Sequence, residues 1–430
     1  MRAVLDWLGS ALAGSIEPPA RIAQRIAARF GTSDEATMFG APRGSAAAAA
    51  FANGVSSHIL ELDDIHKGST VHGAAPIIPA ALAVAERERA SGAAFLTAVT
   101  VGYETAFRIG EAVNPSHYRF WHPTGTVATF GAAAAAGLLV GLTPAQLVHA
   151  LGTAGTQAAG LWEFNADGAM SKHLHPGKAA MNGVMAADLA RAGFTGAGRI
   201  LEGERGFIRA MSGAGDVGRI TAGLGSVWKI AENAYKLHAC CGHTHSAIDL
   251  AIALRSRHAW SAAETLALVA AVDVETYSPG YEIVKEANPR SPYQGKFSMG
   301  YCVAAGLLEG EVGLEQFTAD RFDADGVREP AIAAMLPRIR VSVASDLTAR
   351  YPAAWPARVT LTLADGSQVC DASDYPRGNP ENPIATGVLE DKLVGLVAPR
   401  FGSECAAAAL AAIAALPASR DVSRVFRRLL

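Results

Sequence analysis

Alanine-rich apolar runs are the feature that most restricts how this chain can fold. They recur from residue 1 to about residue 263, as in GAAAAAGLL at 131–139, and polar turns with glycine or proline separate them. Alanine has the highest helix propensity, and its small side chain favours closely packed helices over sheet. We therefore predict helices over the segments 19–29, 44–60, 79–90, 93–113, 124–140, 144–160, 176–192 and 244–257.

The composition changes after this helical part, where β-branched residues with a short period become common. RIRVSVAS and the pair RVTLTLADGSQVCDAS indicate strands, and Asp365-Gly366 within the pair is a hairpin signal. We predict an α+β unit over residues 264–385, with one buried helix near 297–308. Helical character returns over residues 386–430, and we expect these closing helices to rejoin the helical domain of residues 1–263.

Charge and cysteine content restrict the partners and the location of the protein. A formal net charge of −3 gives no electrostatic reason to expect binding to nucleic acid or to an anionic membrane. The five cysteines are odd in number and irregularly spaced, which is typical of a reducing compartment rather than of a disulfide framework. The apolar runs near 126–142 and 405–416 are rich in alanine, so we expect core helices there rather than membrane spans. We predict a cytoplasmic protein.

Four histidine-bearing segments share one pattern, in which a polar turn with histidine is followed by Gly, Pro, Ser or Thr and then by an apolar helix. These segments contain His72, His122, His175 and His245. The start of a helix offers unpaired backbone N–H groups and a partial positive charge, so it attracts anions. A single histidine at such a position is more often a cap than a catalyst, but four similar segments favour a shared site.

The segment SKHLHPGK at 171–178 stands out because Lys172 and Lys178, two of only eight lysines in the chain, lie on either side of its histidines. Pro176 suits the first position of a helix, where its missing N–H costs nothing. No phosphate-binding glycine loop accompanies the segment, so we predict that the ligand is a small carboxylate. A lysine buried near other cations has a lowered pKa, which suits it to proton transfer.

Metal binding is the alternative interpretation of two groups of residues. Asp63, Asp64 and His66 resemble part of a metallohydrolase site, and His243 with His245 forms a candidate ligand pair. Neither spacing matches HExxH or a CxxC zinc pattern, and the cysteines are not spaced for an iron–sulfur cluster. We therefore predict no metal.

Several segments follow one another as in a known family. LELDDIHKGSTVHGAAP, HPTGTVATFG, SKHLHPGKAAMNG, KLHACCGHTHSAID, KFSMGY and YPRGNPENP occur in the order typical of the MmgE/PrpD family, which the chain resembles over nearly its whole length. That family includes 2-methylcitrate dehydratase, cis-aconitate decarboxylase and iminodisuccinate epimerase. The resemblance implies a mainly helical fold, with a large all-helical domain built from both chain ends and a smaller α+β lid domain. It also implies a homodimer and an active site between the domains, without metal or organic cofactor.

Taken with the helix-start argument, the family pattern implies a set of site residues. The implied catalytic residues are His72, His122, Lys172, His175, Lys236 and His245. The implied substrate-binding residues are Glu61, Asp64, Lys178, His243, Lys296 and Tyr301. Two positions depart from the pattern, because Glu61 replaces the usual aspartate and the usual HPG reads His72-Gly73-Ala74.

The chemistry implied by the resemblance is removal of a proton or a carboxylate at a carbon next to a carboxylate. The carbanion that develops needs fixed positive charge and hydrogen-bond donors. We expect Lys172 and Lys236 to bind carboxylates, His122 or His175 to move the proton, and His72 or His245 to serve the leaving group. We predict a cofactor-independent lyase, either a dehydratase or a decarboxylase, that acts on a small di- or tricarboxylate. An epimerase of an aminodicarboxylate such as iminodisuccinate stays open, as does a carboxylate-binding homologue without activity.

Overall fold

The computed structural model describes residues 1–31, 33–427 and 429. The chain divides into two compact units. Unit 1 comprises Met1–Ile59, Asp63–Ala234 and Ala385–Leu430, and unit 2 comprises Leu60–Leu62 and Tyr235–Ile384. Unit 1 therefore contains both ends of the chain.

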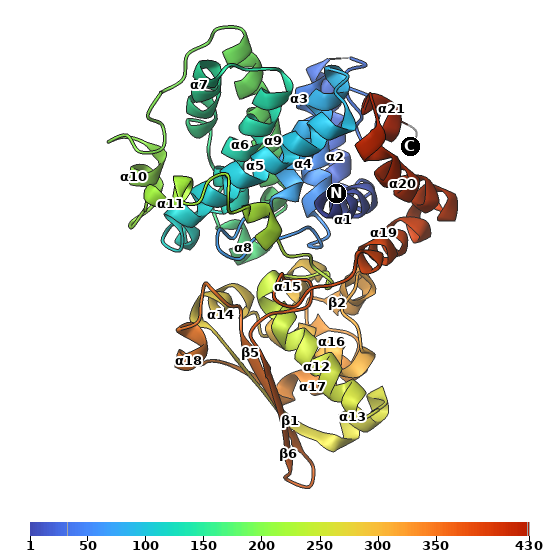
Figure 1. Cartoon of the computed structure of the whole chain (residues 1–430). Helices are drawn as coiled ribbons and strands as arrows, with labels where there is room; N and C mark the ends of the chain where they lie inside the picture. The colour runs from blue at the N-terminus through green and yellow to red at the C-terminus, as the bar shows by residue number, and fades with distance from the viewer. Residues whose placement is uncertain (32, 428, 430) are drawn as a thin grey trace. The chain divides into compact units, whose positions relative to one another are not determined.

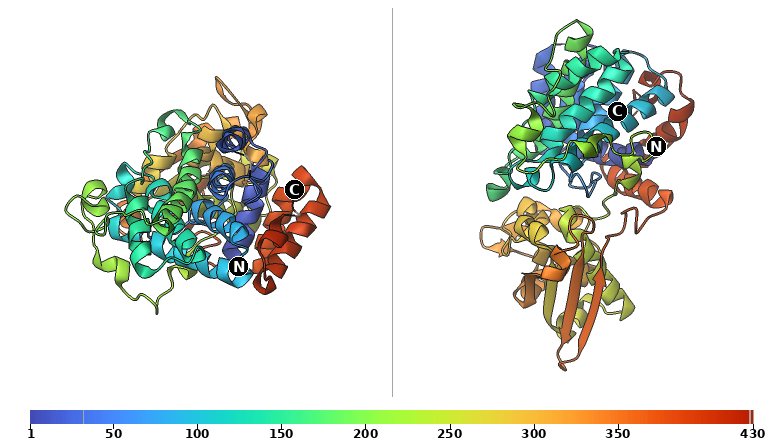
Figure 2. Two further views of the ribbon diagram at one scale, coloured as in Figure 1. Left: turned by 90° about the horizontal axis from the view of Figure 1, so that it is seen from above. Right: turned by 60° about the vertical axis from the view of Figure 1, so that its left-hand side comes forward.

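Unit 1 is built from helices (Figure 1). They are α1 (Arg2–Gly14), α2 (Pro18–Ala27), α3 (Ala46–His58), α4 (Ala74–Arg87), α5 (Gly92–Val113), α6 (Pro123–Leu139), α7 (Pro144–Gly155), α8 (Phe164–Asp167), α9 (Ser171–Arg191), α10 (Phe207–Met211), α11 (Gly218–Thr221), α19 (Thr386–Phe401), α20 (Ser403–Ala415) and α21 (Ser423–Phe426). Helix α6 packs against α4, α5 and α9 and is buried from its first residue to Gly137. The C-terminal helices α19 and α20, red in Figure 2, lie beside α1.

Glycines let these helices approach each other closely, as the alanine-rich runs predict. A Cβ atom on Gly54 of α3 would lie 2.8 Å from the Cα of Gly177 in α9. A Cβ atom on Gly102 of α5 would lie 2.9 Å from the backbone oxygen of Gly131 in α6. Side chains at these crossings would force the helices apart. The contact between α3 and α9 matters for the site, because it brings the end of α3 close to the first turns of α9.

Unit 2 combines helices with a four-stranded sheet. Its elements are α12 (His245–Arg257), α13 (Ala262–Leu268), β1 (Val269–Thr276), α14 (Ser278–Val284), α15 (Pro292–Lys296), α16 (Met299–Glu309), β2 (Phe322–Asp323), β3 (Gly326–Val327), α17 (Pro330–Met335), β4 (Ile339–Val343), α18 (Ser345–Thr348), β5 (Ala357–Leu363) and β6 (Gln368–Ser373). The strand order is β4-β1-β5-β6; β1 pairs with β4 in parallel, whereas the other pairs are antiparallel. The predicted hairpin joins β5 to β6, with Gly366 at a φ of 83°.

Three predicted helix ends differ from the structure by more than three residues. The helix predicted from 79 begins at Ala74, and the helix predicted to reach 160 ends at Gly155. The helix predicted from 176 begins at Ser171, so Pro176 lies inside α9 and not at its first position. Proline inside a helix removes one backbone hydrogen bond, and the packing of α9 against α3 and α6 offsets this loss.

The first unit boundary also differs from the prediction, because residues 235–263 belong to unit 2. Helix α12 packs against α16, β5 and β6, so its apolar side is buried within the α+β unit. None of the helices among the described residues has both the length and the apolar character that a bilayer crossing requires.

Candidate active site

Unit 1 brings five histidines from four segments together. His58 ends α3 and His72 lies two residues before α4. His122 is the N-cap residue of α6, while His173 and His175 lie in the first turns of α9. The centroid of the His58 ring is 4.9 Å from that of His72, 5.6 Å from that of His122 and 6.3 Å from that of His173. These five residues, here called the histidine cluster, include the predicted residues His72, His122 and His175.

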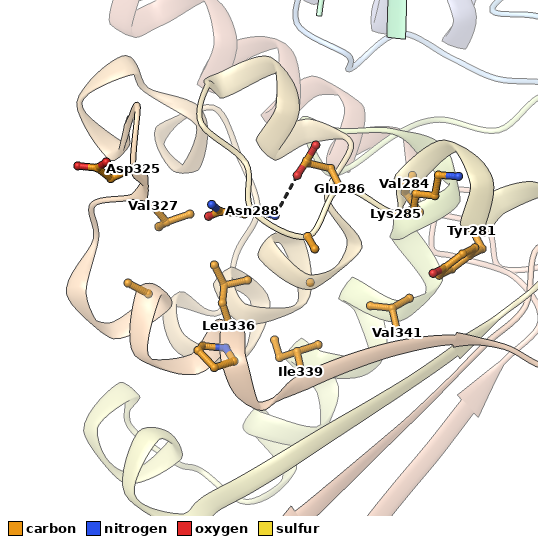
Figure 3. A pocket seen from close by; sticks show the side chains of 14 residues that line it. Tyr281, Val284, Lys285, Glu286, Asn288, Asp325, Val327, Leu336, Ile339 and Val341 are labelled. Atoms are coloured by element: carbon orange, nitrogen blue, oxygen red, sulfur yellow. Dashed lines mark hydrogen bonds between the residues drawn. The ribbon is translucent and has the colours of Figure 1, made fainter. Parts of the chain in front are cut away.

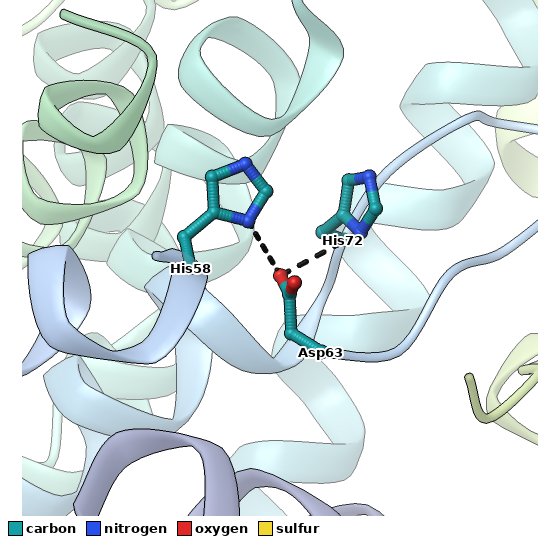
Figure 4. Close-up of side chains that lie close together, drawn as sticks. All are labelled: His58, Asp63 and His72. Carbon is teal, nitrogen blue, oxygen red and sulfur yellow. Dashed lines mark hydrogen bonds and ion pairs between the residues drawn. The ribbon is translucent and has the colours of Figure 1, made fainter. Parts of the chain in front are cut away.

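Asp63 lies between two imidazoles of the cluster (Figure 4). Its Oδ2 is 2.6 Å from Nδ1 of His58 and 3.5 Å from Nδ1 of His72. Nδ1 of His72 has a nearer partner, the backbone oxygen of Asp64 at 2.7 Å. A carboxylate and a carbonyl only accept hydrogen bonds, so Nδ1 carries the hydrogen in both neutral rings and Nε2 carries the lone pair. Both imidazoles are therefore held in the tautomer in which Nε2 is the basic nitrogen.

His122 and His175 form a direct pair. Their Nδ1 atoms are 3.0 Å apart. A hydrogen bond between two imidazole nitrogens needs one N–H and one lone pair, so the two neutral rings must be opposite tautomers. One outer Nε2 therefore carries a lone pair and the other carries a hydrogen. The pair can take up a proton at one end and release a proton at the other.

The surroundings keep this pair uncharged and make its environment positive. Burial, followed by the charges of His175, His58 and Lys172, lowers the pKa of His122 well below its usual range. Burial, followed by the charges of Lys178, His58 and Lys172, lowers the pKa of His175 to about 3. Lys172 itself is only 2% exposed. A buried ammonium beside neutral imidazoles suits a negatively charged ligand.

Lys178 is engaged in a different way from Lys172. Its Nζ donates to the backbone oxygens of Gly125 at 3.2 Å, Gln157 at 3.3 Å and Ala159 at 2.8 Å. These three bonds use the donors of the ammonium group, and burial lowers its pKa to about 8. The contacts support a structural role in tying α9 to α6 and to the segment after α7. Its substrate-binding role stays a prediction.

Asp64 is buried among hydrogen-bond donors. Its Oδ1 accepts from the backbone N–H of Ala74 at 2.9 Å, and its Oδ2 accepts from Tyr103 at 2.6 Å and from Asn233 at 2.8 Å. Burial raises its pKa to about 7, although the bonds from Tyr103 and Ala74 act in the opposite direction. These bonds support a role in anchoring the start of α4, and its predicted contact with substrate stays a prediction.

Replacing Asp64 by asparagine is expected to lower the free energy of unfolding at pH 8 by about 2–3 kcal/mol. At that pH the carboxylate is mostly ionised, and an amide nitrogen in place of one oxygen would face a donor. Urea unfolding followed by circular dichroism measures the change. Glu163→Gln on an exposed turn is the control and should stay within about 0.5 kcal/mol of wild type. Equal stability of Asp64→Asn and wild type would contradict the interpretation, because a neutral side chain would then suffice.

Unit 2 brings three other predicted residues together. Lys236 Nζ lies 3.6 Å from Oε2 of Glu61 and donates to the backbone oxygen of Glu61 at 3.2 Å. Lys296 Nζ donates to the backbone oxygen of Leu60 at 2.9 Å. Glu61 has a φ of 59°, in the left-handed region that residues other than glycine rarely adopt. Two buried lysines therefore hold the short segment Leu60–Leu62.

His243 is also buried in unit 2. Its Nδ1 is 2.5 Å from the hydroxyl of Tyr277, and its ring centroid is 4.4 Å from that of Trp355. Burial, followed by the charge of Lys236, lowers its pKa to about 3. His243 is thus a neutral imidazole that is oriented by a phenol.

His245 and Tyr301 contact backbone oxygens. Nε2 of His245 lies 3.4 Å from the backbone oxygen of Cys240, and the hydroxyl of Tyr301 donates to the backbone oxygen of Gln316. Burial raises the pKa of Tyr301. These partners stabilise unit 2 internally, and the predicted roles of both residues in the reaction stay predictions.

The residues that the sequence suggested as metal ligands differ from those whose ligand atoms the structure brings close together. Among the described residues, the sets His58–Asp63–His72 and His66–Glu111–Glu232 have ligand atoms close enough together to hold an ion. In the first set, a metal at either Nδ1 would have to displace the hydrogen that this atom donates. In the second set, Lys229 Nζ lies 3.0 Å from Glu111 and 3.1 Å from Glu232, so an ammonium already neutralises the carboxylates.

Two hollows of the surface contain none of the predicted site residues, although His173 of the histidine cluster lines the second. A cavity of about 530 Å³ in unit 2 has an apolar floor that includes Leu336, Ile339 and Val341, with Lys285 and Glu286 also lining it (Figure 3). A groove of about 370 Å³ in unit 1 is lined by α2, α3 and the start of α9, and its lining is almost wholly apolar. Neither suits a polycarboxylate, which needs several cationic or donor groups.

Sequence reasoning missed His58 as a site residue. The search pattern required a histidine before a helix, whereas His58 ends one. A usable signal was present, because His58 stands five residues before Asp63 in the segment HILELD. Only the contact between α3 and α9 shows that His58 faces the other histidines.

Comparison with known proteins identifies the class to which this chain belongs. Residues 1–219 match the model of the MmgE/PrpD N-terminal domain, and residues 238–417 match the model of the MmgE/PrpD C-terminal domain. The chain belongs to the MmgE/PrpD family, which confirms the predicted resemblance and the mainly helical two-domain fold.

Curated relatives narrow the comparison further. The chain is 30% identical over 399 residues to a cis-aconitate decarboxylase-like protein, oryM, of Aspergillus oryzae, with 88% of this chain and 81% of the relative covered. It is 30% identical over 350 residues to cis-aconitate decarboxylase of Aspergillus terreus, with 77% and 70% covered. It is 28% identical over 403 residues to cis-aconitate decarboxylase of Homo sapiens, with 91% and 81% covered.

Proposed function

We propose that this chain is a lyase that removes carbon dioxide from a small unsaturated tricarboxylate of the cis-aconitate type. The observation that carries the proposal is the His122–His175 pair, whose Nδ1 atoms are 3.0 Å apart and which lies near the buried charge of Lys172. The relatives named cis-aconitate decarboxylase support the lyase reaction and the substrate class. The homodimer and the cytoplasmic location stay predictions.

The proposed step needs one proton and a place for negative charge. The bond between carbon and the departing carboxylate breaks, and its electron pair stays on the substrate as a carbanion conjugated with the double bond and a remaining carboxylate. Lys172 stabilises this charge by its ammonium group. The carbanion is then protonated on carbon by the imidazole of the His122–His175 pair that carries the Nε2 hydrogen.

Opposite tautomers let the pair relay a proton from water to carbon. When one Nε2 gives its hydrogen to carbon, the Nδ1 hydrogen of the other ring can cross the 3.0 Å contact to replace it. The second ring then takes a proton from water at its own Nε2. The net result is transfer of one solvent proton to carbon, and both rings stay neutral but have exchanged tautomers. Before the next turnover the donor ring takes a proton from water at its Nε2, the Nδ1 hydrogen crosses back, and the second ring returns its Nε2 proton to water.

Proton NMR in D2O tests the proposal. Purified protein is incubated with citrate-like, aconitate-like and aminodicarboxylate compounds, with chelator present. We expect loss of one carboxylate from an aconitate-like compound and one carbon-bound deuterium per carbon dioxide released. Deuterium at an α-carbon with an intact skeleton would instead establish an epimerase. No change in any compound would overturn the proposal in favour of a carboxylate-binding homologue.

A further inference from the structure

His58 has an incomplete set of hydrogen bonds although it is fully buried. Its side chain is 0% exposed, and its Nδ1 bonds to Asp63 at 2.6 Å. Its Nε2 has no hydrogen-bond partner among the described residues. A buried unsatisfied polar atom costs about 1–3 kcal/mol. The imidazole at position 58 is therefore poorly explained by stability alone.

His58 and His72 compete for one carboxylate oxygen. Oδ2 of Asp63 is 2.6 Å from His58 but 3.5 Å from His72, so the short charge-assisted bond goes to His58. His72 instead donates its Nδ1 hydrogen to the uncharged backbone oxygen of Asp64 at 2.7 Å. An imidazole bonded to a carboxylate is a stronger base than one bonded to a carbonyl, because the carboxylate stabilises the imidazolium.

We propose that His58 is a positioning residue that holds Asp63 and thereby keeps the His72 imidazole a weaker base than an aspartate-bound histidine. The proposal extends the proposed function by one residue, His58, which lowers the basicity of His72 within the histidine cluster. It rests on that function only for the effect on catalysis, since the hydrogen-bond competition itself needs no substrate.

The groups that face these two imidazoles come from several elements. Asp63 lies in the loop after α3, His122 lies at the start of α6, and His173 and His175 lie in α9. The charge of Lys172, also in α9, acts on His122 and His175. Asp63 is the acidic group that contacts both His58 and His72, so a change at His58 is expected to reach His72 chiefly through it.

Titration of histidine by 15N NMR tests the proposal without substrate. The protein is labelled at histidine nitrogens, and His72 is assigned by the loss of its signals in His72→Gln. In His58→Leu, Oδ2 of Asp63 becomes available to His72. The pH at the midpoint of the His72 titration, here called the His72 midpoint, should therefore rise by about one unit. His58→Asn retains a donor near the position of Nδ1 and should leave this midpoint close to that of wild type.

His58→Met keeps the proposal falsifiable if His58→Leu does not fold, because it also takes the Nδ1 donor away from Asp63. Asp63→Asn removes the negative charge 3.5 Å from Nδ1 of His72, so it should lower the His72 midpoint, and His58→Leu added to Asp63→Asn should not raise it again. No rise in a folded His58→Leu or His58→Met variant, or an equal rise when Asp63 is already asparagine, would overturn the proposal. His238→Leu removes another buried histidine that pairs with a carboxylate, Asp249 at 3.0 Å, and should not move the His72 midpoint.

Activity supplies a second readout if the decarboxylation is observed. In His58→Leu the acid limb of the kcat/KM profile should move to higher pH by the same amount as the His72 midpoint. If kcat/KM fell equally at every pH and the acid limb of the profile did not move, His58 would have only a structural role. Because the NMR titration is independent of turnover, absence of decarboxylation would overturn the proposed function and leave this inference to be decided by the midpoints.

Discussion

Replacement of Lys172 by methionine is expected to lower kcat/KM for decarboxylation by about 10²- to 10³-fold. Methionine keeps much of the length of the side chain but removes the ammonium whose charge acts on both His122 and His175. The negative charge that develops on the substrate then loses its fixed counter-charge. Steady-state kinetics with the substrate found by NMR measure the loss, and thermal unfolding should show little change.

Lys178→Met is the matched control for Lys172→Met, because both lysines lie in the first turns of α9. Three backbone oxygens would lose their donor, so we expect a stability loss of about 2 kcal/mol. The folded Lys178→Met protein should retain most of its activity. If Lys178→Met were inactive but stable while Lys172→Met remained active, the roles of the two lysines would be reversed.

Replacing either member of the His122–His175 pair by asparagine is expected to lower kcat by about 10²- to 10⁴-fold. Each substitution breaks the path by which a hydrogen crosses between the two Nδ1 atoms. Because the two rings act as one unit, kcat of the double variant should be hardly lower than kcat of the less active single variant. Single and double variants compared in one kinetic cycle measure this coupling.

His117→Asn is the control for the pair. His117 is buried, and its ring bonds to the backbone oxygen of Met211 at 2.9 Å and to Thr126 at 2.7 Å, so both nitrogens have structural partners. Its replacement should cost stability and leave kcat largely intact. If the losses at His122 and His175 simply multiplied, the two histidines would act independently and the shared proton path would be wrong.

Local sequence signals predicted the presence of helices and strands better than the residues at which they begin and end. The alanine-rich runs predicted most of the long helices of unit 1, and Asp365-Gly366 predicted the β5–β6 hairpin, because propensity and turn chemistry act over a few residues. The short helices α8, α10 and α11 were not predicted. Pro176 misled the prediction of where α9 begins, since burial against α3 and α6 outweighs the lost hydrogen bond. The unit boundary was misplaced because α12 is an ordinary helix in sequence, and its neighbours α16, β5 and β6 are remote along the chain.

The candidate site was also predicted only in part from the sequence. The residue types near helix starts pointed to His72, His122, His175 and Lys172, and the family resemblance added Lys236. The sequence could not distinguish Lys172 from Lys178, because the carbonyls that surround Lys178 come from α6 and from the segment after α7. Nor could it find His58, whose partners are set by the crossing of α3 and α9.

The sequence by itself determined the family, the mainly helical composition and the supply of histidines and lysines for carboxylate chemistry. The tertiary structure alone decided which nitrogen of His58 and of His72 carries the hydrogen, that His122 and His175 are opposite tautomers, and which lysine is held by carbonyls. It also decided that Asp63 bonds more closely to His58 than to His72. The physical reason is that tautomer and charge depend on hydrogen-bond partners within about 3 Å, and here those partners come from separate segments of the chain.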